Sequence, residues 1–477
     1  MVSTTNGKRW SALALIVTAQ FMVILDVAIV NVALPSIKHD LGFSESSLQW
    51  VVSAYAIFFG GALLLGGRLA DLLGRRRVFA GGLLLFAASS LVCGLAWSEG
   101  SLIGFRAVQG LAGALLAPAA LSLLMTTFAE GRERNLALGI YGAASGSGAA
   151  AGVLLGGVLT SYLSWSWIFF VNVPVGIAAA LLTPVLLRES RAELGHRHFD
   201  LRGAATATSG LMLLVYALTR ATTDGWSAPA TIALLAASVG LLGLFLVIES
   251  RSPWPLLPLR LFRMGTLAAA NFSIAVIGAV AFSEFFLLTL YLQQVLGYSA
   301  MRTGVAFVGF AGTVVIVSNL AQAIVARLGV RATLTTGLLL SFVSVAWLSR
   351  LPVGGHYFWD VFPGFVLGGA GMALSFVPVT IAGLAGVSPA DAGVASGLIN
   401  TSRQIGGAIG IAAATAIAAA VTPAGPDLAA LDHGFRVSLV ALAGLLLVGA
   451  AVAAAFVRPA PRPAPVEELT YALEEAA

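Results

Sequence analysis

Apolar residues occur along this chain in runs of about 18 to 25, separated by short segments that carry most of the charge. A helix needs about 20 residues to cross roughly 30 Å of hydrocarbon. The pattern therefore predicts an all-α integral membrane protein with fourteen transmembrane helices, at residues 11–36, 47–67, 78–97, 101–126, 136–160, 167–187, 203–219, 230–248, 266–292, 303–325, 333–349, 361–384, 398–421 and 435–457.

The first apolar run follows Lys8 and Arg9, as the apolar core of a signal peptide would. It is longer than such a core, it contains Asp26, and no small-residue cleavage site follows it. We therefore expect a retained first span.

Composition agrees with a membrane protein, because 58% of the 477 residues are hydrophobic and 10% are charged, against about 25% charged in soluble domains. A water-soluble globular protein is excluded. The single cysteine, Cys93, allows no intrachain disulfide, and the five histidines fall in predicted connections, so we expect no metal site.

Lysine and arginine are distributed unequally between the two sides of the predicted membrane. One side carries most of them, including Lys8, Arg9 and Arg75–Arg77, and the other carries only Lys38, Arg220, Arg302, Arg350 and Arg436. An even number of spans puts both termini on the same side, and the positive-inside rule makes that side the cytoplasm. The net charge of +5 then reflects topology and not nucleic-acid binding.

An internal repeat relates the two halves of the chain. Residues 68–85, RLADLLGRRRVFAGGLLL, align without gaps on residues 323–340, AIVARLGVRATLTTGLLL, which pairs Gly74 with Gly329. The same offset superposes the first span on the ninth. Parallel repeats are typical of transporters, whose substrate site lies near the midplane between the halves. We expect a six-helix bundle in 1–190, two inserted helices with cytoplasmic linkers in 191–264, a second six-helix bundle in 265–457 and a flexible cytoplasmic tail in 458–477.

Charged residues in the middle of a span cost roughly 2.5 to 3.5 kcal/mol each on insertion scales, so each one requires a reason. Asp26 is either a proton carrier or a carboxyl fixed by hydrogen bonds to a neighbouring helix. Arg106 either pairs with Asp26 in one conformation or extends to the outer interface. Glu284 lies on the span that the repeat pairs with that of Asp26, so both acids are expected to face a shared cavity; alternatively, Glu284 is a paired carboxyl or attracts cationic substrates.

Two further segments suggest conformational roles. The loop after the second span combines glycines, an acid and arginines; Asp71 is placed to meet a helix N-terminus or a basic side chain across the interface of the halves. Its alternative is a simple stop-transfer cluster. The fifth span places glycines four residues apart, which leaves one face free of side chains and open to close approach by another helix. This face either slides during transport or is a static packing surface. The candidate gating residues are Gly67, Arg68, Asp71, Gly74, Arg75, Arg76, Gly148, Gly152, Gly156 and Gly157.

Together these segments resemble the major facilitator superfamily, and specifically its fourteen-span drug:proton antiporter family. The matching motifs are LDVAIVNVALP in the first span, GGRLADLLGRRRV in the loop, FRAVQG in the fourth span and WSWIFFVNVPVG at the start of the sixth. The resemblance implies a proton-linked role for Asp26 and Arg106 and a gating role for the loop. The chain departs from the family at Val153, where a proline is usual, and at Ser166, where an arginine is usual.

The resulting prediction is a monomeric, proton-coupled antiporter of a bacterial plasma membrane that exports lipophilic small molecules, often cationic, using the proton gradient and no cofactor. Residues expected to line the substrate cavity are Asn31, Gln109, Phe282, Phe285, Phe286, Tyr291, Asn319, Gln322, Phe376 and Asn400. Export of one dedicated metabolite, antibiotic or lipid is the alternative. An enzyme is not expected, because no connection is long enough to hold a catalytic centre and no GxxxxGK[ST] phosphate loop occurs.

Overall fold

The structure is a computed structural model, and it describes residues 2–458 except 44, 49, 130, 191–199, 254, 256, 258, 264, 389–390 and 423–426. The predicted tail and part of the first linker thus lie outside the described residues. The described part contains helices and no strand. Its first half consists of α1 (Val2–Leu41), α2 (Glu45–Leu48), α3 (Trp50–Leu73), α4 (Arg75–Gly94), α5 (Glu99–Thr127), α6 (Arg132–Tyr162), α7 (Trp167–Phe170) and α8 (Asn172–Leu186).

The rest of the chain contributes the pair that follows the first half and then the second half. The pair is α9 (Leu201–Asp224) and α10 (Pro229–Arg251), followed by the 3₁₀ turn η1 (Leu259–Arg263). The second half contains α11 (Gly265–Leu290), the π turn η2 (Tyr291–Val295), α12 (Ala300–Leu348), the π turn η3 (Tyr357–Val361), α13 (Phe362–Leu384), α14 (Ala392–Val421) and α15 (Leu428–Phe456).

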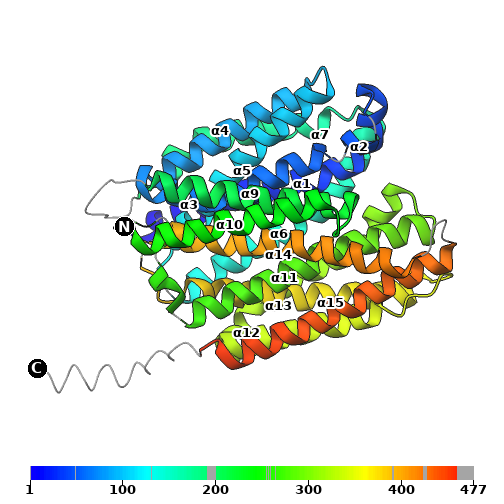
Figure 1. The fold of residues 1–477 in the computed structure, drawn as a ribbon. Coiled ribbons are helices and arrows are strands. Elements are labelled where there is room, and N and C mark those ends of the chain that lie inside the picture. The colour runs from blue at the N-terminus through cyan, green and yellow to red at the C-terminus, as the bar shows by residue number, and fades with distance from the viewer. Residues whose placement is uncertain are drawn as a thin grey trace, which may run out of the picture.

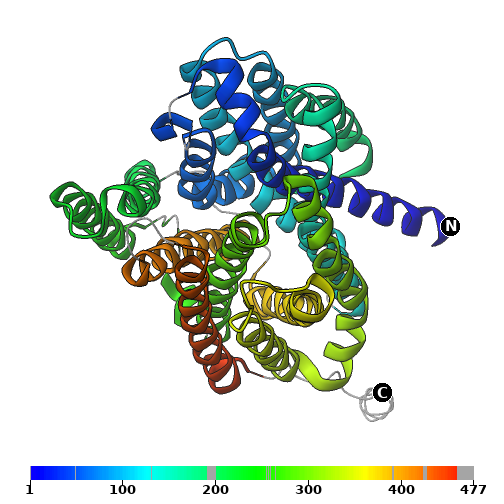
Figure 2. The ribbon, with the colours of Figure 1, turned by 90° about the vertical axis from the view of Figure 1, so that its right-hand side faces the viewer.

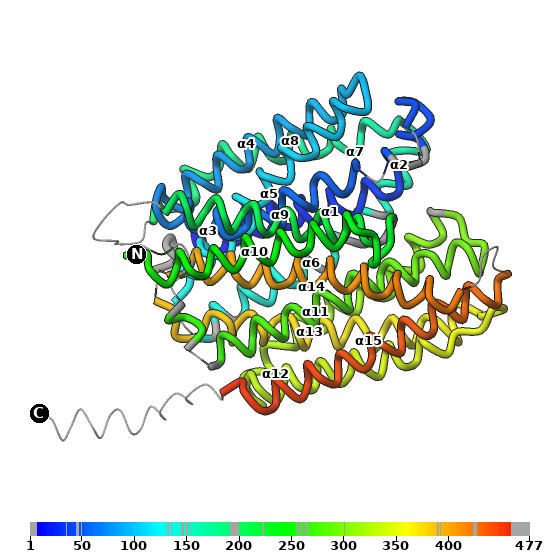
Figure 3. The backbone as a smooth tube through the Cα atoms, viewed as in Figure 1, coloured from blue at the N-terminus to red at the C-terminus, as the bar shows by residue number. Residues whose placement is uncertain are grey.

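The axes of the long helices are roughly aligned, and the helices lie side by side. Helix α1 begins at the same end of the molecule at which α15 ends (Figures 1 and 3). Viewed along the helices, the first half and the second half form two groups, and α9 and α10 stand at their flank (Figure 2). The halves meet where α3 and α5 pack on α14 and where α6 packs on α12 and α13, while α9 contacts both α3 and α14. This arrangement agrees with the expected two bundles and inserted pair.

The repeat is visible in the backbone at two glycines. Gly74 separates α3 from α4 with φ 107° and ψ 128°, and Gly329 interrupts α12 with φ 81° and ψ 165°. Such dihedrals are accessible essentially only to glycine. Sequence positions that the repeat aligns therefore form the same kind of helix–helix turn.

Gly329 reverses the direction of the chain within α12. Tyr291 donates a hydrogen bond to the carbonyl of Pro352 just after α12 (2.7 Å), and Tyr357 donates one to the carbonyl of Ala306 near its start (2.7 Å). Both ends of α12 thus lie at one end of the molecule. A straight helix of its 49 residues would also be more than twice as long as the hydrocarbon is thick.

Twelve helices of the described residues are long and apolar enough to cross a membrane, with Met301–Leu348 counted once. The reversal at Gly329 divides that segment into the two spans predicted from sequence. The 31-residue α6 is long enough to cross as well. The total of fourteen stays a prediction that these two observations support.

We expect Gly329→Ala to destabilise the protein by about 1 to 2 kcal/mol, since a Cβ is unfavourable at this φ although nothing lies within 4 Å of the added atom. Thermal unfolding of the purified protein in detergent measures the effect. Gly81→Ala is the matched control, because Gly81 lies inside α4 with equally open surroundings and no positive φ. Equal unfolding temperatures for the two variants would contradict the assignment of a strained turn.

The glycines of α6 face α1, as the predicted close approach requires. Added Cβ atoms at Gly148, Gly152 and Gly156 would lie 3.2 Å from the Cβ of Ile24, 2.7 Å from that of Ala28 and 3.0 Å from the carbonyl oxygen of Ile29, respectively. Gly157 instead faces Met301 at the start of α12. The close packing is confirmed, whereas sliding along this face stays a prediction. The side chain of Val153 lies outside the described part.

Candidate coupling site and gate

Asp26 lies at the centre of a polar network inside the first half. Its carboxylate is fully buried and accepts hydrogen bonds from Arg106 Nη1 (2.6 Å), Gln109 Nε2 (2.8 Å) and Asn172 Nδ2 (2.8 Å). These donors come from α5 and α8, and Ser90 on α4 accepts hydrogen bonds from both amides. The predicted contact between Asp26 and Arg106 is therefore confirmed, whereas its role in coupling stays a prediction.

Arg106 is held inside the protein by several contacts. Its Nε donates to the carbonyl of Val51 (3.0 Å), its Nη1 also donates to Gln109 Oε1 (2.7 Å), and its Cζ lies 4.4 Å from the ring centre of Tyr55. The side chain is 1% exposed. The alternative that Arg106 extends to the outer interface is therefore wrong.

Three residues expected at the shared cavity lie on α1 and α5. Asp26 points into the first half and not into a space between the halves, because the donors that compensate its charge lie on α5 and α8. Gln109, expected in the substrate cavity, is one of those donors. Asn31 is exposed on α1 and donates to the carbonyl of Val27 one turn earlier (2.9 Å).

Glu284 lies within the second half. Its carboxyl is 9% exposed, and an added Cβ at Gly368 would lie 3.5 Å from Oε1, which places the group beside α13. It forms no hydrogen bond or ion pair in the described part of the chain. Glu284, on the span that the repeat pairs with that of Asp26, thus differs from Asp26 in having no ion-pair partner among the described residues.

Asp71 joins the two halves at the end of the molecule where α1 begins. Its carboxylate binds Arg75 Nη2 (2.8 Å) and accepts hydrogen bonds from the backbone N–H groups of Gly393 (3.2 Å) and Val394 (3.1 Å) at the start of α14. An anion at a helix N-terminus is stabilised by the unpaired N–H groups and the helix dipole. The predicted contact with a helix N-terminus across the interface is confirmed, whereas the basic side chain that binds Asp71 belongs to the same half.

The other loop residues surround this contact. Gly67 packs on Gly393 so closely that an added Cβ would lie 2.5 Å from its carbonyl oxygen. Arg68 is buried nearby, at 6% exposed. Gly74 and Arg76 contact Glu189, which accepts the backbone N–H of Arg76 (3.2 Å).

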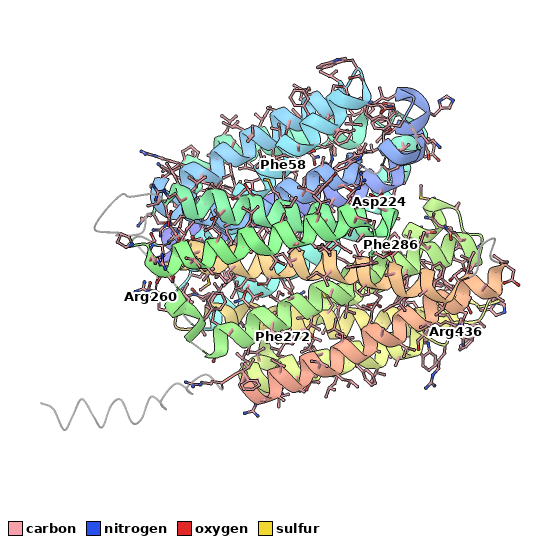
Figure 4. The ribbon with its side chains drawn as sticks, in the orientation of Figure 1. Phe58, Asp224, Arg260, Phe272, Phe286 and Arg436 are labelled. Carbon is pink, nitrogen blue, oxygen red and sulfur yellow. The ribbon has the colours of Figure 1, made fainter. Side chains whose placement is uncertain are left out.

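The expected cavity residues of the second half fall into two groups. Gln322, which donates to the carbonyl of Leu136 (3.3 Å), and Phe376, which packs against Gly142, reach the other half. Five others contact their own half: Phe282 against Gly407, Phe285 tilted against Phe307, Tyr291 bonded to Pro352, Asn319 bonded to Val315 and Asn400 bonded to Ser396. Phe286 is exposed on α11, as Figure 4 also shows.

Sequence reasoning missed one buried mid-span charge, Arg403, which is 7% exposed. The predicted span began at residue 398, so Arg403 seemed to lie near a helix end. The helix α14 begins at Ala392 instead, which places Arg403 three turns inside the helix. The signal available from sequence was the apolar and small-residue character of residues 392–400.

Comparisons with known proteins agree with this architecture. The sequence profile of the Major Facilitator Superfamily matches residues 16–411. The chain belongs to this superfamily. It is 39% identical over 460 residues to a puromycin resistance protein of Streptomyces alboniger, covering 94% of this chain and 91% of that protein. It is 40% identical over 427 residues to a cephamycin export protein of Amycolatopsis lactamdurans, covering 89% and 88%.

The fold of this major facilitator protein is also similar to a solved structure. The crystal structure of the human organic anion transporter MFSD10 (TETRAN) matches with a TM-score of 0.66 and 17% identity, covering 93% of this chain and 99% of that one. At that identity the likeness concerns the fold alone. Membership of the superfamily and the arrangement of two halves of helices thus agree with the expectation from sequence.

Proposed function

We propose that this protein is a proton-coupled antiporter that exports lipophilic small molecules by alternating access. The observation that carries the proposal is the Asp26–Arg106 ion pair, closed at 2.6 Å and fully buried among α1, α5 and α8. A proton arriving at Asp26 cancels one charge of the pair and leaves the Arg106 guanidinium without its counter-ion. The packing of these helices therefore differs in stability between the two protonation states.

The contacts of Asp71 are the part of the interface between the halves on which a change of protonation at Asp26 would act. They hold α3 of one half to α14 of the other, and an alternate conformation has to break them. We assign this end to the cytoplasm of a bacterial plasma membrane, since Arg260 lies there, whereas Arg436, on the sparsely charged side, lies at the opposite end (Figure 4). A single chain is the proposed working unit, and no cofactor is needed.

The proton gradient supplies enough free energy for export. At a membrane potential of about −100 mV, one proton moving inward releases roughly 2.3 kcal/mol. At 1.4 kcal/mol per tenfold change, this supports about a 40-fold gradient of a neutral compound.

The test is proton movement in proteoliposomes that contain a pH-sensitive dye. A proton gradient is imposed, and a panel of lipophilic cations and neutral drugs is added one at a time. Proton efflux or influx that depends on a panel compound supports antiport. Movement with one compound alone would support a dedicated exporter, as the name of the cephamycin export protein suggests for that relative. Movement with none would contradict the proposal.

We expect Glu284→Gln to fold as the wild type does, because the described structure gives its carboxyl no ionic partner to lose. Export of lipophilic cations should nevertheless fall by about tenfold, since Glu284 is the acid available to balance a cation in the second half. Transport of a neutral compound serves as the internal control. Equal transport of cations by wild type and variant, at equal unfolding temperature, would remove Glu284 from the mechanism.

A further inference from the structure

Arg403 is a buried cation whose hydrogen-bonding capacity is largely unused. A guanidinium carries five N–H donors, and the described residues give Arg403 one weak acceptor, Asn400 Oδ1 at 3.4 Å. No ion pair to it occurs among the described residues. A buried charge without a counter-ion is costly and is retained in membrane proteins chiefly where it has a function.

A second unused donor lies on α3, the helix of the other half that packs on α14. The hydroxyl of Tyr55 on α3 is buried and has no hydrogen-bond partner in the described part of the chain. The two helices meet next to Arg403, since a Cβ added at Gly60 on α3 would lie 3.9 Å from the Cβ of Gln404 on α14. Tyr141 is engaged, since its hydroxyl donates to Gln20 Oε1 (2.7 Å), whereas Tyr55 is available.

An apolar surface completes the group. The ring centre of Phe376 on α13 lies 5.8 Å from Arg403 Cζ. Arg403, Asn400, Phe376 and Tyr55 are named here the Arg403 cluster. It combines hydrogen-bond donors from α14 and α3 with an aromatic face, and Asp26, the acid on the far side of Tyr55, is already bound by Arg106.

We propose that the Arg403 cluster binds a carboxylate group of the exported compound, with the apolar part of that compound against Phe376. The planar guanidinium matches a carboxylate with two parallel hydrogen bonds, and the Tyr55 hydroxyl supplies a third donor. Because the residues of the Arg403 cluster come from both halves, a displacement of one half against the other changes the spacing between its donors and its aromatic face.

The position of Tyr55 also connects this site to the coupling site. Its ring lies on Arg106 Cζ at 4.4 Å, and its hydroxyl belongs to the Arg403 cluster. A carboxylate that draws Tyr55 toward Arg403 therefore changes the packing on the Asp26–Arg106 pair. The inference rests on the proposed export function, whose substrate it makes more specific.

The test compares two dyes that differ in one group, rhodamine B, which has a free carboxylate, and its ethyl ester. Their affinities for the purified protein in lipid nanodiscs are measured by fluorescence anisotropy. The wild type is expected to prefer the acid by about tenfold or more, as for a charge-assisted hydrogen bond. In Arg403→Gln the ratio of the two affinities is expected to fall to within about twofold of unity.

Two further variants make the result specific. Tyr55→Phe removes only the hydroxyl and should lower the preference for the acid by about three- to tenfold; it decides the matter if Arg403→Gln does not fold. Arg350→Gln removes the same charge from an exposed position at the end of α12 and should leave the ratio as in the wild type. A wild type without preference, or a ratio unchanged in Arg403→Gln and Tyr55→Phe, overturns the inference.

This measurement is independent of coupling, because equilibrium binding needs no proton gradient. A preference for the acid without compound-dependent proton flux in liposomes would contradict the proposed function and leave the binding site intact. Proton flux with both dyes and no preference would contradict the binding site alone.

Discussion

Substitution of Asp26 by Asn is expected to reduce compound-dependent proton flux to below about 1% of the wild-type value. An amide takes up no proton at this position, and it leaves the 1% exposed Arg106 without its counter-charge. Removing one partner of a buried ion pair also costs about 3 to 5 kcal/mol of stability. Flux is measured with the pH-sensitive dye in proteoliposomes, and stability by thermal unfolding in detergent.

A double variant separates coupling from folding. In Asp26→Asn with Arg106→Gln no charge remains buried at the site, so we expect most of the lost stability to return and the flux to stay absent. Asp224→Asn is the control, because it makes the same chemical change in the partly exposed ion pair with Arg220 and should retain flux. Flux above about a tenth of wild type in Asp26→Asn would show that another group carries the proton.

The second large effect is expected at Asp71, where Asn should lower transport by at least tenfold. The carboxylate accepts two N–H groups of α14 and binds Arg75, which is 1% exposed. The neutral amide weakens the charge–dipole attraction between the halves and removes the ion pair with Arg75. Hydrogen–deuterium exchange of the peptide that contains Gly393 and Val394 should become faster.

Glu189→Gln is the matched control for Asp71→Asn. Glu189 is a carboxylate at the same end of the molecule, but its contacts with Arg76 and Arg77 lie within the first half. Exchange at the start of α14 should therefore remain as in the wild type. Faster exchange in Glu189→Gln, or unchanged exchange in Asp71→Asn, would show that this carboxylate does not hold the two halves together.

Much of the architecture follows from sequence, for a simple physical reason. A lipid bilayer requires each crossing to be a helix of about 20 apolar residues, so the spans can be read from hydropathy alone. The repeat predicted that Gly74 and Gly329 are equivalent, and the backbone dihedrals of both confirm it. The roles of Asp71 and of the α6 glycines as contact points were also predictable, because their chemistry allows few alternatives.

Side-chain direction within a span is what the sequence left open. Successive residues of a helix differ in direction by about 100°. An error of two residues in assigning a position to a helix face therefore turns its side chain from a cavity to the interior of a bundle. Asp26 was expected in a shared cavity and lies within the first half. Arg403 was overlooked because its helix begins six residues before the predicted start.

The sequence by itself therefore determined that this chain is a helical membrane protein with two related halves, and which charges have to be explained. Only the tertiary structure decided how those charges are compensated. Asp26 is bound by Arg106, Gln109 and Asn172, and Asp71 by Arg75 and the N-terminus of α14, whereas Arg403 has only the weak acceptor of Asn400 among the described residues. Hydropathy depends on neighbours along the chain. Compensation of a buried charge instead depends on residues far apart in the sequence whose atoms come within about 3 Å of it, and only packing specifies which residues these are.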